Sequence, residues 1–137
     1  MAKKTVRTIM KSTHLCLRPK MDLTMVSNHL SKHNLSGAPV TDENNNPIGF
    51  VSEYDCLEQL LQSTYYCDNT ALAQDVMSTK LISTSPGLAL IDVASQMNNN
   101  KVNVAPVIEN GKVIGVISRG DIMRELVKEL AACKVPV

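Results

Sequence analysis

Two short stretches of the sequence combine a hydroxyl group, a carboxylate and the expected start of a helix. They read SRGD at residues 118–121 and SEYD at residues 52–55. A serine followed three residues later by an acid is typical of a capping box, in which each side chain satisfies a free backbone N–H group. The same arrangement can bind a small molecule, because a helix N-terminus attracts phosphate and a nearby carboxylate can accept the two hydroxyls of a ribose. The residues alone leave both interpretations open.

The two motifs differ in charge at their second position. Arg119 stands in one motif, whereas Glu53 stands in the other. An arginine can pair with a phosphate, and a glutamate would repel one. Lys80 lies just before the predicted first strand of the half of the chain that contains Arg119, and it adds a second positive group near the same cleft. We therefore expect the cleft that contains Asp121 to be the occupied one, with a weaker or vacant cleft at Asp55. A solvent-exposed position on the helix is the alternative for Arg119.

The motifs belong to an internal repeat. At a spacing of 67 residues, Met10 matches Met77, Pro19 matches Pro86, and the segment APV at 38–40 matches APV at 105–107. After an Asn-rich turn the spacing becomes 66, and this brings the two Ser-x-x-Asp motifs into register. A one-residue change of length in an Asn/Gly-rich stretch is what a surface turn tolerates. The sequence is therefore an internal duplication.

Each copy has the same predicted order of elements. Residues 15–17 and 81–83 are short apolar runs followed by a proline, and they predict a first strand. Apolar residues at i, i+3 and i+7 then predict an amphipathic helix beginning at Leu23 in one copy and at Leu90 in the other. The segments 38–52 and 105–118 predict hairpins, and the apolar residues within 57–61 and 122–130 predict closing helices.

The predicted unit is thus β-α-β-β-α, present twice. Three strands bury too little apolar surface to be stable alone, so each copy needs its twin. We expect an α/β (α+β) fold in which two repeats pack as a pseudo-two-fold pair, with small sheets inside and helices outside. The segment 62–74 loses the apolar periodicity and predicts a connector. We place the repeats at 1–67 and 68–137, as one intimate two-repeat module.

Taken together, the paired APV hairpins, each followed by Ile-Gly, two hydrophobic residues, Ser-x-x-Asp and a helix, resemble a tandem pair of cystathionine-β-synthase (CBS) domains. The resemblance covers nearly the whole chain, including the lead-in segments at 6–10 and 73–77. It implies a stand-alone regulatory module without catalytic activity, and a flat, disc-like homodimer. It also implies an adenosine-containing ligand, such as AMP, ADP, ATP, a dinucleotide or S-adenosylmethionine, bound between the repeats with no required cofactor.

The resemblance also implies roles for individual residues. In the main cleft, Asp121 would hold the ribose, Ser118 would contribute to phosphate binding, and the base would lie against the first strand and the residues before Ala-Pro. The main cleft then comprises Ser118, Arg119, Asp121, Lys80, Ile82, Val102, Asn103 and Ala105. The second, weaker cleft comprises Ser52, Asp55, Leu15, Leu35 and Ser36.

The composition argues against several classes of function. A net charge of +1, from 14 basic and 13 acidic residues, gives no field that attracts nucleic acid, and four aromatic residues provide little for base stacking. Apolar runs are far shorter than a membrane span, and no apolar leader opens the chain. The four cysteines form no C-x-x-C pair. We expect a soluble protein of the reducing cytoplasm that binds neither nucleic acid nor membrane.

Other candidate sites are weaker. His29 and His33 lie four residues apart on a predicted helix, a spacing that could hold a metal, but no third ligand is evident, and a polar helix flank is favoured. His14 and Cys16 alternate on a predicted strand, where a buried thiol is favoured. The sequence contains no G-x-S-x-G, no Walker loop and no clustered acid pair, so we expect no enzyme.

Two classes of function follow from these patterns. In the first, an adenosine-containing ligand shifts an equilibrium that an unknown partner reads in trans. In the second, the clefts are empty and the helices, above all residues 122–130, build a homodimer that acts on a partner. We favour the ligand sensor.

Overall fold

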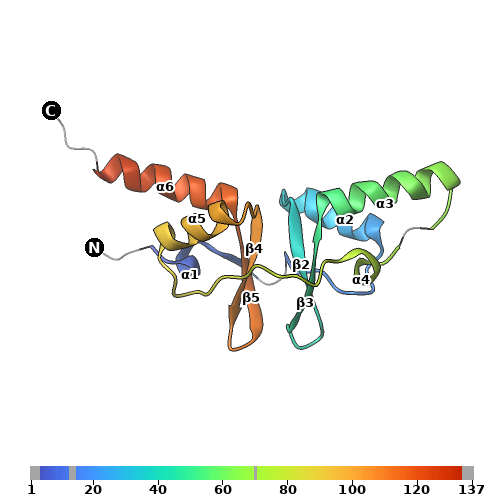
Figure 1. Ribbon diagram of the computed structural model, residues 1–137, viewed down its shortest axis with the longest axis horizontal. Helices are drawn as coiled ribbons and strands as arrows, with labels where there is room; N and C mark the ends of the chain where they lie inside the picture. Colours follow the sequence, from blue (N-terminus) through green and yellow to red (C-terminus); the bar gives the residue numbers. More distant parts are fainter. Residues whose placement is uncertain (1–3, 13–14, 70, 134–137) are drawn as a thin grey trace.

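The computed structural model describes residues 4–12, 15–69 and 71–133. These residues form two halves that lie side by side, each with a hairpin and a pair of helices (Figure 1). The first half contains α2 (Leu23–His33), β2 (Gly37–Thr41), β3 (Pro47–Ser52) and α3 (Glu53–Tyr66). The second half contains α5 (Leu90–Asn99), β4 (Val104–Glu109), β5 (Lys112–Ser118) and α6 (Arg119–Cys133). The expected α/β class, the helices and both hairpins are confirmed.

The hairpins are antiparallel and share one irregularity. The register runs from Gly37 opposite Ser52 in one, and from Val104 opposite Ser118 in the other, and it shifts after Val40 and after Val107. The β4–β5 turn places Asn110 and Gly111 at positive φ, which Asn and Gly adopt most readily. The last residue of each hairpin is the serine of a Ser-x-x-Asp motif, Ser52 in one and Ser118 in the other.

The expected first strands are reduced to single bridges. Leu17 pairs in parallel with Val40, and Thr84 pairs in parallel with Val107. In the first copy the Leu17 N–H donates to the Pro39 carbonyl at 2.8 Å, and the Leu17 carbonyl accepts from Thr41 at 2.9 Å. A proline follows two residues later in both copies and has no N–H to donate, which limits the pairing. The paired residue in the second copy also lies one position beyond the predicted 81–83.

The predicted connector at 62–74 is partly helical. Helix α3 continues to Tyr66 and ends where Cys67 adopts a left-handed conformation, and α4 (Ala73–Val76) begins soon afterwards. Thr70 lies outside the described residues. The end of α3 is exposed on most of its surface, so it needs no apolar periodicity to remain helical, and the sequence pattern therefore missed it.

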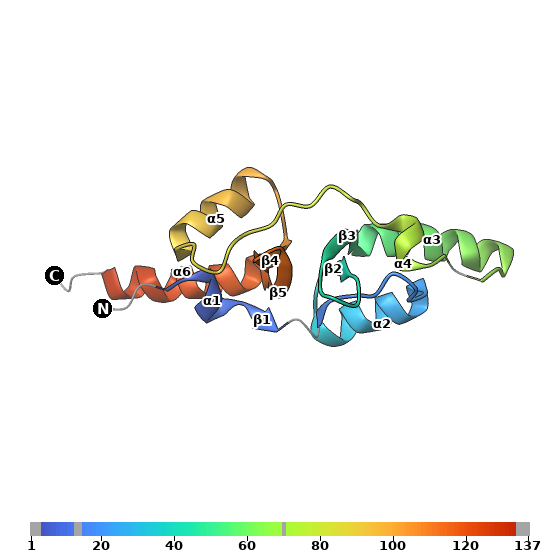
Figure 2. The same cartoon turned by 90° about the horizontal axis from the view of Figure 1, so that it is seen from below.

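The two lead-in segments are exchanged between the halves. Helix α1 (Val6–Ile9) and strand β1 (Lys11–Ser12) precede α2 in the sequence, yet β1 pairs with β5 and Val6 is fully buried in the second core. Conversely, α4 packs on the first half, where Ala73 is fully buried and its N–H donates to the Met21 carbonyl at 2.8 Å. Figure 2 shows both placements. Each packing unit therefore combines segments of both sequence repeats.

Three ion pairs fix the N-terminal segment on the second half. Lys4 pairs with Glu125 at 3.0 Å, Arg7 with Glu109 at 2.5 Å and Lys11 with Asp121 at 3.7 Å. The bond from Lys4 is the main cause that lowers the pKa of the Glu125 carboxyl below its ordinary value. Every cation of residues 4–12 thus faces an acid of the other repeat.

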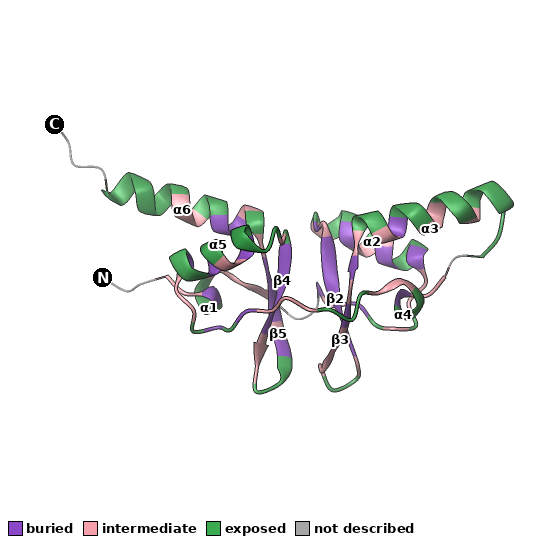
Figure 3. Ribbon diagram, viewed as in Figure 1, coloured by how far each residue is buried: buried purple, intermediate pink, exposed green. Residues whose placement is uncertain are grey.

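The core consists of two apolar clusters that meet at the central hairpins. Val104 and Val116 of the second half belong to the first cluster, and the Val113 N–H donates to the Asn45 carbonyl at 2.8 Å across the boundary. Buried residues gather on these hairpins, while the outer helices are largely exposed (Figure 3). None of the helices in the described part of the chain is long and apolar enough to cross a bilayer.

Candidate functional site

Both Ser-x-x-Asp motifs cap their helices. The Ser118 hydroxyl donates to Asp121 Oδ2 at 2.7 Å, and the Asp121 N–H donates to Ser118 Oγ at 3.2 Å. The Ser52 and Asp55 pair repeats these bonds at 2.9 and 3.2 Å. The capping interpretation therefore holds for both copies. It uses one carboxylate oxygen of each aspartate and leaves the other for a different partner.

The second oxygen distinguishes the two aspartates. Asp121 Oδ1 accepts a hydrogen bond from the Arg124 guanidinium and lies 3.7 Å from Lys11 Nζ. Asp121 is only 7% exposed, so these cations offset the cost of burying its charge. Within the described residues, Asp55 makes no ion pair. The second motif thus carries a neutralised acid, and the first carries an acid without a neighbouring cation.

Two cavities lie between the repeats, next to the motifs. The Arg119 cavity, of about 200 Å³, is lined by Lys11, Leu35 and Ser36 from the first repeat and by Ser118, Arg119 and Arg124 from the second. The Lys80 cavity, of about 220 Å³, is lined by Ser36, Phe50 and Ser52 from the first repeat and by Lys80, Ile82 and Val102 from the second. Asn103 and Val104 line both cavities. Each volume is below the roughly 300 Å³ at which sites for drug-sized ligands begin, so a whole nucleotide would extend beyond either cavity.

The cavities regroup the residues predicted from the sequence. The sequence predicted each cleft within one repeat, whereas each cavity takes residues from both. Ser118 and Arg119 share a cavity with Leu35 and Ser36, which were expected in the other cleft. Ser52 in turn shares a cavity with the segments 80–82 and 102–103. The physical reason is that the central hairpins of the two copies pack against each other, which brings both repeats to each opening.

Four predicted residues do not line these cavities. Leu15 and Ala105 are buried in the first and second apolar clusters, with exposed fractions of 3% and 1%. Asp121 and Asp55 are absent from the cavity walls, and Asp121 is connected to the Arg119 cavity through Lys11 and Arg124. Lys11 and Arg124 were missed by sequence analysis. The spacing of Arg124, three residues after Asp121 on one helix, was the available signal for it.

The charge difference between the motifs has a spatial counterpart. The charged residues of the Arg119 cavity are Lys11, Arg119 and Arg124, and all of them are cationic. Lys80 and Lys101 are the charged residues of the Lys80 cavity. Glu53 instead lines a groove between α2 and α3. Both cavities therefore favour an anionic group, and the larger number of cations is at Arg119.

The histidine and cysteine candidates are placed as follows. His29 Nε2 lies 3.3 Å from the Leu15 carbonyl oxygen, and the rings of His29 and His33 meet edge to face at 4.7 Å. Across residues 4–12, 15–69 and 71–133, no three metal-ligating side chains are grouped to hold an ion. Burial raises the pKa of the Cys16 thiol to about 11, against an opposing effect of Arg18. His14 lies outside the described residues.

Comparison with protein families identifies the repeats. The model of the CBS domain matches residues 6–62 and again residues 73–128. The chain belongs to the CBS domain family. Its two CBS repeats lie on either side of the α3–α4 connection. Sequence resemblance to a tandem CBS pair is thereby confirmed.

Curated relatives align with most of this chain. Uncharacterized protein MJ1225 of Methanocaldococcus jannaschii is 28% identical over 121 residues, which cover 88% of this chain and 42% of that protein. Uncharacterized protein MJ1426 of the same organism is 26% identical over an alignment 137 positions long. The alignment covers 77% of this chain and 82% of that protein. The chain thus spans less than half the length of the first relative and most of the second.

Solved CBS structures share the fold. A putative acetoin utilization protein, AcuB, from Vibrio cholerae has a TM-score of 0.81 at 22% identity, with 98% of this chain and all of that chain covered. CBSX2 of Arabidopsis thaliana in complex with AMP has a TM-score of 0.76 at 25% identity, with 92% of this chain and 98% of that chain covered. The arrangement of two small sheets with outer helices is therefore that of CBS domain pairs.

Proposed function

We propose that this CBS pair is a regulatory module that binds an adenosine-containing ligand at the Arg119 cavity, with Asp121 as the acceptor for the ribose. The observation that carries the proposal is the convergence of three cations on the capped start of α6. The complex of CBSX2 with AMP, in a chain of the same fold at 25% identity, supports an adenosine ligand. AMP is the first compound to test.

Phosphate binding is supported by charge and by helix geometry. Arg119 is the first residue of α6, a helix of 15 residues, so its side chain and the helix N-terminus act at the same place. Lys11 and Arg124 add positive charge to the wall of the cavity. An arginine is suited to a phosphate because its planar guanidinium can donate two parallel hydrogen bonds. Ser118 contributes its hydroxyl at the same wall.

Ribose binding is assigned to Asp121. One of its oxygens caps α6, and the other is held by Arg124 and Lys11. The hydroxyls of a ribose would replace these two cations at the Asp121 carboxylate. Both cations would then be available to the phosphate. Leu35, Ser36 and Asn103 at the same opening are the residues available to the base. The Lys80 cavity, with Ile82, Val102 and Ser52, is the second and weaker site.

The output of the module is a change in a partner protein. Ligand that bridges the two repeats would stabilise one packing of the hairpins, and a partner that binds this packing would read the difference. The chain acts as a regulator and not as a catalyst, and it acts as a homodimer. All four cysteines are free thiols, which supports the reducing cytoplasm as its place of action.

The test is thermal unfolding with AMP, ADP, ATP and S-adenosylmethionine. A ligand at 100 times its dissociation constant adds about 2.7 kcal/mol, a shift on the order of 10 °C for a chain of this size. We expect one compound to raise the Tm of the wild type but not of Asp121→Ala. Asp55→Ala is the matched control, since it removes the corresponding cap and should keep the shift.

The outcomes separate the two classes of function. A shift that is lost in Asp55→Ala and kept in Asp121→Ala would move the site to the Lys80 cavity. If no compound shifts the wild type at millimolar concentration, the proposal of a ligand sensor fails. A ligand-free interaction module, for which the exposed apolar residues of α3 and α6 provide a surface, would then replace it.

A further inference from the structure

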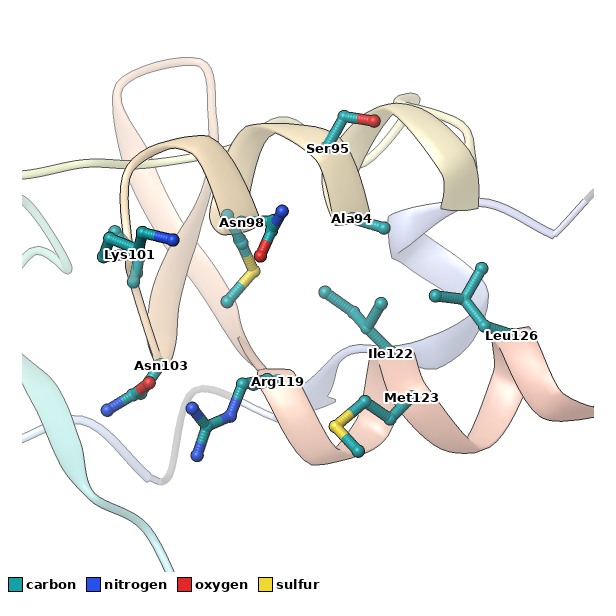
Figure 4. A pocket seen from close by; sticks show the side chains of 11 residues that line it. Ala94, Ser95, Asn98, Lys101, Asn103, Arg119, Ile122, Met123 and Leu126 are labelled. Atoms are coloured by element: carbon teal, nitrogen blue, oxygen red, sulfur yellow. The ribbon is translucent and has the colours of Figure 1, made fainter.

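A further cavity lies on the side of α5 opposite its contact with α6. Ala94 and Asn98 line the groove between α5 and α6 (Figure 4). Gln96 lies about half a turn from both around the helix, and it lines a different cavity, of about 390 Å³. This volume is within the range of sites for small molecules. The Gln96 cavity shares no residue with the Arg119 cavity or the Lys80 cavity.

The walls of the Gln96 cavity are mostly polar. They are formed by Ser83, Thr84, Ser85, Leu88, Gln96 and Ile108. Gln96 Nε2 donates to the Ser83 carbonyl at 2.9 Å, which leaves Gln96 Oε1 as a free acceptor. Among the described residues, neither this oxygen nor Oγ1 of Thr84, a residue only 6% exposed, has a hydrogen-bond partner. Buried acceptors without a donor are costly, so the cavity favours a ligand that donates hydrogen bonds.

An arginine occupies the equivalent place in the first half. At the repeat spacing of 67 residues, Ser85 corresponds to Arg18 and Ile108 corresponds to Thr41. The Arg18 guanidinium donates to the Thr41 hydroxyl at 3.1 Å and to the Asp42 carbonyl. A serine replaces this long side chain in the second half, and the Gln96 cavity lies beside that serine. The cavity is therefore the space that an arginine side chain would fill.

The backbone of the two halves supports this comparison. The Thr84 N–H donates to the Pro106 carbonyl at 3.0 Å, and the Ile108 N–H donates to the Thr84 carbonyl at 2.9 Å. Leu17 makes the two corresponding bonds in the first half, at 2.8 and 2.9 Å. The side chain of the next residue therefore leaves the backbone at the same place beside each hairpin.

The surroundings of the cavity favour a cation. Gln96 lies in the last turn of α5, where the helix dipole is negative, and this turn carries no basic residue. The residues that line the cavity are uncharged, and Arg18 in the first half is likewise held by neutral oxygens. The Arg119 and Lys80 cavities are lined by cations, so they would repel the same ligand.

We propose that the Gln96 cavity binds a small molecule that carries a guanidinium group. The guanidinium takes the place of the side chain that Ser85 lacks, and it donates to Thr84 Oγ1 and Gln96 Oε1. The site is separate from the proposed nucleotide site. It is tested without nucleotide, so its outcome is independent of the function proposed above.

The probe is n-propylguanidine, which has the length of an arginine side chain, and binding is followed by NMR. We expect saturable shifts of the Gln96 side-chain amide and of the backbone amides of Thr84 and Ser85, with a dissociation constant on the order of 1 mM. The uncharged compound n-propylurea has the same shape. It should bind about tenfold more weakly, because its hydrogen bonds are not assisted by charge.

Two variants are designed to remove the site and keep the fold. Ser85→Arg supplies the guanidinium from the chain itself, so it should abolish the response to the probe and raise the Tm by about 3 °C. Thr84→Val removes the unpartnered hydroxyl with little change of shape, so it should weaken binding about tenfold and leave the Tm no lower than that of the wild type. Ser95→Arg is the matched control, since it places an arginine at an exposed position of α5 outside the cavity and should bind the probe as the wild type does.

Three results would overturn the proposal. The first is a wild-type protein without saturable shifts at about 20 times the expected dissociation constant. The second is equal affinity of Ser85→Arg and the wild type, which would place the probe elsewhere. The third is binding of N-acetylarginine methylamide about tenfold tighter than that of n-propylguanidine, which would replace the small molecule by an arginine of a partner protein. Circular dichroism identifies a variant that has failed to fold, and the comparison of n-propylguanidine with n-propylurea on the wild type then decides.

Discussion

The Lys11 ammonium lies 3.7 Å from the carboxylate of Asp121, although the two residues belong to different sequence repeats. Lys11 reaches this position because β1 pairs with β5 of the other half. Arg124 binds the same carboxylate oxygen from within α6. The proposed acceptor for a ribose is therefore held by cations of the protein itself, and a ligand has to compete with them.

Removal of Arg124 should strengthen binding of adenosine. Arg124→Ala removes one of the two cations that hold Asp121 Oδ1 and leaves only Lys11 there, and adenosine has no phosphate that would benefit from the guanidinium. Because the Arg124 side chain is largely exposed, we expect a gain in affinity of about threefold to fivefold, less than about 1 kcal/mol. Isothermal titration calorimetry measures the change. Arg7→Ala breaks an ion pair outside the cavity and is the control, and weaker binding by Arg124→Ala would contradict the competition.

Loss of either helix cap should lower stability, but only one should affect the ligand. Ser52→Ala and Ser118→Ala each remove a side chain that accepts from a backbone N–H, at a cost of about 1 kcal/mol in the free energy of unfolding. Urea denaturation measures this cost. In addition, Ser118→Ala should bind AMP more weakly, whereas Ser52→Ala should retain the wild-type affinity. Equal losses of affinity in both variants would argue against the Arg119 cavity as the site.

Truncation of Val6 should destabilise the whole module. Val6 is fully buried in the core of the second half, and Val6→Ala leaves a cavity there, with a cost of about 2 kcal/mol. Met25→Ala, at a position that is 54% exposed, should change the free energy of unfolding by less than about 0.5 kcal/mol. Chemical denaturation compares the two. A cost for Val6→Ala no larger than that of the control would mean that α1 is not docked in solution.

The helices and hairpins could be predicted because their signals are local. The spacing of Leu23, Val26 and Leu30 predicts one face of a helix, and all three are buried on α2. The capping serines are equally local, since each lies three residues from its acid. The first strands were predicted less well, because a single bridge at Leu17 or Thr84 depends on the hairpin beside it and leaves no pattern of its own.

The cavities could not be predicted because they depend on packing between distant segments. Ser118 and Ser36 line one cavity only because the two central hairpins meet, and no periodicity encodes that contact. The same holds for Lys11, whose position follows from the exchange of the lead-in segments. The contrast between Glu53 and Arg119 was evident in the sequence. Only the structure shows that Glu53 lines the groove between α2 and α3 and that Arg119 lines the groove between α5 and α6.

The cysteines should differ in reactivity. The raised pKa of Cys16, about 11, keeps its thiol protonated at neutral pH, and burial also raises the pKa of Cys56. Cys67 and Cys133 are exposed. Because the thiolate is the nucleophile, iodoacetamide at pH 8 should label Cys67 and Cys133 well before Cys16 and Cys56. Mass spectrometry of timed samples gives the order in which the cysteines are labelled. Early labelling of Cys16 would contradict the burial and raised pKa of its thiol.

The exchange of lead-in segments prevents the module from being divided at the repeat boundary. A fragment that ends between α3 and α4 would lose Ala73 from its own core, and it would carry Val6 with no second half to receive it. Neither of the two protein fragments made by a cut at this boundary can therefore fold as the corresponding repeat does in the intact chain. The two halves should unfold in one cooperative transition, so a perturbation at either cleft is transmitted to the other through shared folding stability.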